Sequence, residues 1–135
     1  MGSNLAVKTQ AFNPGENQEW LGSRHGTQEM DPVTLDGAAL IAIFPTGIVP
    51  SGVVLAKSSV TGKYTRYANA GANGLGTPLG HLFTTVDLTD GGLVPAGADH
   101  TGSILWHGEI VEAKLPTGHG LDAGAKTAMP MFRYV

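Results

Sequence analysis

The stretch GIVPSGVVLAKSSVTGKYTRY, residues 47–67, decides the fold, because it holds two β-rich runs on either side of a turn. The first run, SGVVLAKSSV, and the second, TGKYTRYA, are rich in the branched and aromatic residues that suit strands. Thr61 and Gly62, where the second run begins, are expected to form the turn, because glycine supplies the positive φ that a tight turn needs. The stretch therefore predicts a strand–turn–strand unit, and it contains no obvious nucleophile or metal ligand.

Further strand-like runs follow the same pattern on both sides of this unit. PVTL and ALIAIF precede it, and PLGHLFTTVDLTD and SILWHGEIVEAKL come after it. In the last run Trp106 and Ile110 fall on one face of a strand with period two, and we expect both to lie in the core or at a subunit interface. The segment LDAGAKTAM predicts one short helix, capped by Asp122.

Composition points to a mostly β fold with at most one or two short helices. The chain has 135 residues, including 20 glycines and eight prolines, about twice the usual combined share. Glycine and proline scattered between short β-rich runs indicate many turns. The length fits a single domain. We expect an extended N-terminal arm, residues 1–31, followed by one β-rich domain, residues 32–135.

Charge and cysteine content exclude several classes of function. The net charge is −3 and only 14% of the residues are charged, whereas nucleic-acid binding needs a basic face. The absence of cysteine excludes disulfides and thiolate metal sites. No apolar run approaches the roughly 20 residues of a membrane span, and the N-terminus lacks a signal-peptide pattern. We therefore expect neither a nucleic-acid nor a membrane partner, and synthesis in the cytoplasm.

The N-terminal arm is polar, rich in glycine and without hydrophobic periodicity. It could bury too little apolar surface alone to offset the entropy of ordering it. Two interpretations of Phe12, Trp20 and Leu21 remain open. Either these side chains fold back on their own domain, or they anchor the arm on a partner and become ordered there.

Five histidines are the strongest candidates for catalytic chemistry: His25, His81, His100, His107 and His119. His107 and Glu109 would share a strand face, so with His81 or His100 they could bind a metal on a β-barrel. A His-x-His pair is absent, and so is a Gly-x-Ser-x-Gly motif. We therefore expect no metal, no other cofactor and no enzymatic activity, and keep a small metalloenzyme as the alternative.

Three blocks in order carry a resemblance to a known family: VPSGVVLAKSSVTGKYTRY, TPLGHLFTTVDLT and SILWHGEIVEAKLP, residues 49–67, 77–89 and 103–116. Together they resemble the head decoration proteins of tailed bacteriophages, the lambda decoration-protein family. That family tends to carry a Gly-x-Val-Leu-x-Lys strand, a Thr-Gly-Lys-Tyr turn, a Pro-x-Gly strand and a final His-Gly-Glu-Val strand. The chain matches the last with Ile110 in place of valine.

The resemblance implies a small β-tulip or barrel-like fold, assembled as a homotrimer. It implies binding at local threefold positions of the expanded capsid, on the virion exterior, where the trimer stabilises the major capsid protein shell against internal DNA pressure. It also implies an N-terminal arm that becomes ordered on the capsid, with Phe12, Trp20 and Leu21 as candidate anchors. Another virion β-module, such as a tail-tube or fibre-tip domain, is a further alternative.

Overall fold

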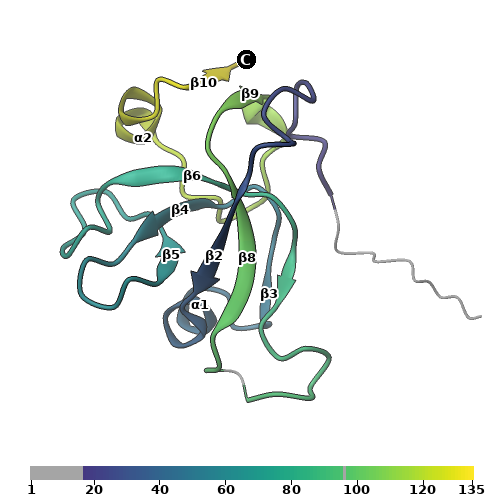
Figure 1. Ribbon diagram of the computed structural model, residues 1–135, viewed down its shortest axis with the longest axis vertical. Coiled ribbons are helices and arrows are strands. Elements are labelled where there is room, and N and C mark those ends of the chain that lie inside the picture. The colour runs from purple at the N-terminus through teal and green to yellow at the C-terminus, as the bar shows by residue number, and fades with distance from the viewer. Residues whose placement is uncertain (1–16, 96) are drawn as a thin grey trace, which may run out of the picture.

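A computed structural model of the chain describes residues 17–95 and 97–135. Five strands form a closed barrel in the order β2-β5-β4-β6-β8 (Figure 1). They are β2 (Asp31–Leu35), β4 (Val54–Lys57), β5 (Tyr64–Arg66), β6 (Pro78–Leu82) and β8 (His100–Leu105). Outside the barrel lie β3 (Ile48–Val49), β7 (Val86–Asp87), β9 (Gly108–Ile110), β10 (Phe132–Tyr134), α1 (Gly37–Ile43), α2 (Ala123–Ala128) and the 3-10 turn η1 (Glu112–Lys114). The prediction of a mostly β, barrel-like fold with two short helices is confirmed.

The predicted strand–turn–strand unit is the hairpin of β4 and β5. The two strands pair antiparallel, with Lys57 opposite Tyr64. Gly62 has a φ of +74° in the turn, and the backbone N–H of Ser58 donates to the carbonyl of Lys63. The local turn chemistry thus sets the register of this part of the barrel.

Strand β4 is buried on both faces, which explains its unbroken apolar sequence. Leu55 packs inside the barrel, in a cluster with strand residues such as Leu82 and Ile104. Val54 and Ala56 point the other way, into a second cluster. The second cluster lies between the barrel wall and the N- and C-terminal segments, so these segments act as an outer layer over β4.

The run Ala-Leu-Ile-Ala-Ile-Phe, predicted as a strand, forms helix α1 instead. Its cap is Asp36, whose carboxylate accepts the N–H of Ala39 at 3.1 Å. Leu40 is fully buried in the barrel cluster, and Ile41 and Phe44 pack against it. A short apolar run fits a buried helix as well as a strand, and Asp36 supplies the cap that a helix needs at its start. Figure 1 shows α1 at one end of the barrel, opposite α2 and β10.

The last predicted strand, residues 103–115, is broken in two. β8 ends at Leu105 and β9 begins at Gly108, so Trp106 and His107 lie between them. Gly108 has a φ of +147°, a conformation that other residues rarely adopt. The break separates the two residues that were predicted to lie in the core or at a subunit interface: Ile110 is fully buried, whereas Trp106 keeps 37% of its surface exposed.

The predicted C-terminal helix is present as α2. Asp122 caps it, accepting the N–H of Ala125 at 2.7 Å. The chain then returns as β10, which pairs parallel to β9 with Phe132 opposite Gly108. The C-terminal residues therefore close the outer layer of the protein next to β9.

Candidate functional site

The N-terminal segment is fixed to the body at Trp20. The indole is fully buried in the second cluster, and its N–H donates to the hydroxyl of Ser51 at 3.0 Å. That hydroxyl donates to the carbonyl of Phe83 at 2.6 Å, and the side-chain amide of Gln18 donates to the same carbonyl at 2.7 Å. We call this arrangement of Gln18, Trp20, Ser51 and Phe83 the root of the N-terminal segment.

The structure places the indole of Trp20, one of the candidate arm anchors, in the core of its own subunit. For this residue the structure agrees with the first interpretation, in which the side chain folds back on its own domain. Leu21 also packs against the second cluster and forms a bridge with Ile110. Phe12 lies outside the described residues.

Residues 20–22 extend the small sheet of β9 and β10. The N–H of Gly22 donates to the carbonyl of Glu109 at 2.9 Å, and the N–H of Val111 donates to the carbonyl of Trp20 at 2.7 Å. The segment therefore runs antiparallel along one edge of β9, while β10 occupies the other edge. Three segments distant in sequence are joined on this side of the barrel.

A buried histidine lies at the centre of this outer layer. His81, on β6, is fully buried and stacks on Trp20 with ring centroids 5.7 Å apart, while Phe132 meets it edge-on at 5.1 Å. Its Nδ1 is 2.8 Å from the carbonyl of Gly52, and its Nε2 is 2.8 Å from the hydroxyl of Tyr134. A carbonyl only accepts, so Nδ1 carries the proton and Tyr134 donates to Nε2.

Burial determines the protonation of this pair. Desolvation lowers the pKa of His81 to about 4, against the smaller opposing effect of its hydrogen bond to Gly52. Burial also raises the pKa of the Tyr134 hydroxyl. Both groups are therefore neutral at neutral pH, and their hydrogen bond links β6 of the barrel to the C-terminal strand β10.

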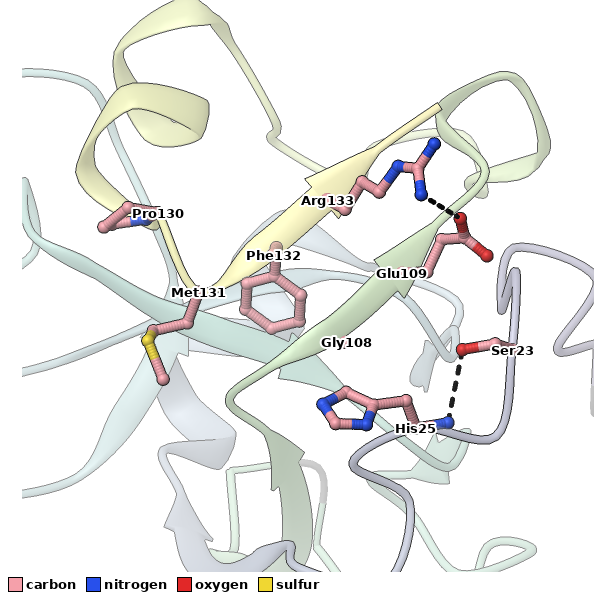
Figure 2. Close-up of a pocket in the computed structure, with 8 residues that line it drawn as sticks. All are labelled: Ser23, His25, Gly108, Glu109, Pro130, Met131, Phe132 and Arg133. Carbon is pink, nitrogen blue, oxygen red and sulfur yellow. Dashed lines mark hydrogen bonds and ion pairs between the residues drawn. The ribbon is translucent and has the colours of Figure 1, made fainter.

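A hollow of about 440 Å³ opens beside this layer (Figure 2). Gly108 and Glu109 of β9 contribute to its lining, together with Ser23 and His25 from the N-terminal segment. The remaining residues that line it are Pro130, Met131, Phe132 and Arg133. Met131 is 62% exposed, and Arg133 Nη1 lies 3.8 Å from Glu109 Oε2 across the β9–β10 pair. The hollow is thus half apolar and half polar.

The histidine set predicted for a metalloenzyme is not brought together. His81 is enclosed in the core, and His100 begins β8 with Nδ1 3.0 Å from the carbonyl of Ala98. Within residues 17–95 and 97–135, no group of three or more histidines and carboxylates could hold a metal ion. His107 contacts His25 instead, a pairing that no sequence pattern indicates, because 82 residues separate the two.

Large apolar side chains remain exposed at several points of the surface. The most exposed is Leu93, at 85%, which follows a turn in which Asp90, Gly91 and Gly92 all have positive φ. The others are Ile48, Val60, Leu79, Trp106, Met131 and Val135. Trp106 therefore stays a predicted interface residue, with its indole N–H donating to the carbonyl of Glu29.

No model of a known protein family matches the chain, and no curated protein matches it. In the part of the chain that the structure describes, no helix has the length and apolar character required to cross a membrane.

Proposed function

We propose that the chain is a capsid decoration protein, which binds as a homotrimer at local threefold positions of an expanded phage capsid. It stabilises the major capsid protein shell against DNA pressure and has no enzymatic activity. The observation that carries the proposal is where the three family-like sequence blocks fall. The first supplies β4 and β5, the second β6 and β7, and the third the end of β8 together with β9. The resemblance thus coincides with most of the barrel wall.

The fixed root changes how the arm acts in this proposal. Trp20 and Leu21 belong to the subunit's own outer layer, so the capsid-binding arm comprises the residues that precede Asn17. Phe12 is then the remaining aromatic anchor in that stretch. Strand addition to a capsid-protein edge would give such an arm affinity only where the assembled shell offers an edge.

Three copies in one trimer make weak contacts sufficient. Once one arm is bound, the other two bind at a high effective concentration. Trp106 is our candidate for the contact between copies, because a half-exposed indole beside β9 is the kind of residue enriched at protein interfaces.

Deletion of residues 2–16 tests the proposal. The truncated chain retains Gln18 and Trp20, so it should keep its thermal stability and its sedimentation as a trimer. We expect it to lose binding to undecorated expanded shells of the virus that encodes it, as measured by co-sedimentation and electron microscopy. The matched control is Val60→Ser, which alters an exposed apolar side chain on the β4–β5 turn and should bind normally.

Two results would contradict the proposal, one for the role of the arm and one for capsid binding itself. Undiminished shell binding by the truncated chain would remove the arm from the mechanism. Failure of the full-length protein to bind expanded shells at all would remove capsid decoration itself.

A further inference from the structure

We infer that His25 and His107 form a binding site for a divalent transition cation of the zinc class. The inference is independent of capsid binding and rests on the contact between these two rings. Nδ1 of His107 lies 3.3 Å from Nε2 of His25, and the ring centroids are 5.0 Å apart at an interplanar angle of 70°. Two nitrogens bound to one tetrahedral zinc ion, each at roughly 2.0–2.1 Å, lie about 3.3–3.4 Å apart.

The surroundings of His107 favour the tautomer in which the lone pair of Nδ1 is free to bind a metal. The other ring nitrogen, Nε2, is buried and lies 3.4 Å from Oε1 of Glu29. Nε2 has no hydrogen-bond partner at this distance, but a Glu29 carboxylate turned to accept its proton would leave the lone pair on Nδ1, which is the usual arrangement behind a metal-binding histidine. The side chain of Glu29 is 67% exposed, so it can rotate to shorten this contact.

Two glycines allow the segments that carry these rings to meet. A Cβ on Gly26 would lie 2.3 Å from the carbonyl oxygen of His107, and one on Gly108 would lie 2.8 Å from the carbonyl oxygen of His25. Both glycines have positive φ. The close backbone contact therefore fixes where the two imidazoles face each other, rather than leaving the pairing to two free side chains.

The site has one rigid and one adjustable ligand. His107 is buried, with only 7% of its surface exposed, and its ring contacts Trp106 at a centroid distance of 4.0 Å. His25 is an exposed residue on the N-terminal segment and lines the hollow of Figure 2. Its ring can therefore move from a hydrogen bond to His107 into a position where both lone pairs converge on a cation. For that, its own proton must reside on Nδ1.

The hollow supplies the remaining coordination positions. It is large enough for several waters and is lined by His25, whereas Glu109 on its wall is already paired with Arg133. Two imidazoles completed by water suit zinc, nickel or copper, and they do not suit calcium or magnesium, which prefer oxygen ligands alone. With two histidine ligands, the expected role is to hold the N-terminal segment on β9, and no catalysis follows from it.

Isothermal titration of the untagged full-length protein with ZnCl₂ tests the site. We expect one zinc per chain, and a rise in melting temperature that grows with zinc concentration. His25→Gln should weaken binding at least tenfold without loss of fold, because the residue is exposed. His100→Gln is the matched control: it removes a partly exposed histidine on β8, which has no second histidine against it among the described residues, and should bind as the unmodified chain does.

Glu29→Gln separates a metal site from a simple hydrogen bond. It leaves the two rings in place and removes the carboxylate behind His107, so zinc affinity should fall by about tenfold or more while stability without metal changes little. Zinc should also shift the imidazole NMR signals of both histidines together. No heat and no shift at millimolar zinc, or binding that His25→Gln leaves intact, would show that the pair is only hydrogen-bonded.

Discussion

His81 makes the stability of this protein depend on acid in a way that can be calculated. The ring is fully buried, and desolvation lowers its pKa to about 4 from an ordinary value of 6.5. Above pH 6.5 the ring is neutral in both the folded and the unfolded chain, and its full contribution is present. As the pH falls from 6.5 to 4, the unfolded chain takes up a proton that the folded chain refuses, so the free energy of unfolding falls.

The size of the effect follows from the two pKa values. At about 1.36 kcal/mol for each pH unit between them, the loss reaches about 3 kcal/mol by pH 4 and levels off below it. This is a large fraction of the ~5–15 kcal/mol by which small domains are stable.

Urea unfolding followed by tryptophan fluorescence, at a series of pH values from 7 to 4, measures this loss. His81→Asn is the informative variant, because its amide can still donate to Gly52 and does not titrate. It will be less stable at pH 7, since the hydroxyl of Tyr134 loses its acceptor. All other side chains are common to the two proteins, so the difference between the two curves isolates His81.

We expect that difference to shrink by about 3 kcal/mol between pH 7 and pH 4. Ser59→Ala, at an exposed position without a titratable group, should retain the acid dependence of the unmodified chain. Curves for the unmodified chain and for His81→Asn that stay parallel over the whole range would refute the reasoning, because the ring would then be titrating in the folded state as in water.

Two further substitutions test the packing of the barrel and the root. Ser51→Ala leaves the indole N–H of Trp20 buried without an acceptor, and should lower the free energy of unfolding by about 1–3 kcal/mol, whereas Ser59→Ala, at an exposed position, should leave it unchanged. Gly80→Ala would place a Cβ 2.2 Å from the carbonyl oxygen of Leu105, so we expect a loss of several kcal/mol in urea unfolding, on the order of the largest single-site effects. Gly97→Ala meets nothing within 4 Å and should be neutral, and equal effects at the two glycines would contradict the β6–β8 packing.

Elements with local signals were predictable from the sequence. The β4–β5 hairpin depends on Gly62 in its turn, and α2 depends on the capping carboxylate of Asp122, three residues before the N–H that it binds. Helix α1 was missed although Asp36 marks its start in the same way. The apolar run that follows was long enough for either structure, and its tertiary position over the barrel end decided the outcome.

The contacts that build the site are long-range, and periodicity carries no information about them. Trp20 and Ser51 are 31 residues apart, and nothing within either segment points to the other. The parallel pairing of β9 with β10 needs the intervening helix to turn the chain back, and the break after Leu105 lies where His25 and Gly26 approach Gly108 and His107. The sequence could therefore nominate Trp20, Trp106 and Ile110 as important apolar residues without assigning each to core or surface.

The root gives the proposed arm a mechanical property that a loosely attached leader would lack. If residues before Asn17 hold a capsid protein, tension along the arm passes first to Gln18 and Trp20. Gln18 donates a hydrogen bond to the backbone carbonyl of Phe83, and Trp20 is linked to that carbonyl by hydrogen bonds through Ser51. The tension is therefore carried by the chain between β6 and β7 as well as by the N-terminal segment. Withdrawal of the indole would require opening the second cluster and exposing a buried tryptophan, on top of breaking these hydrogen bonds. An arm that holds the capsid against pressure needs an attachment of this kind, because it can carry only as much force as its attachment to the folded domain withstands.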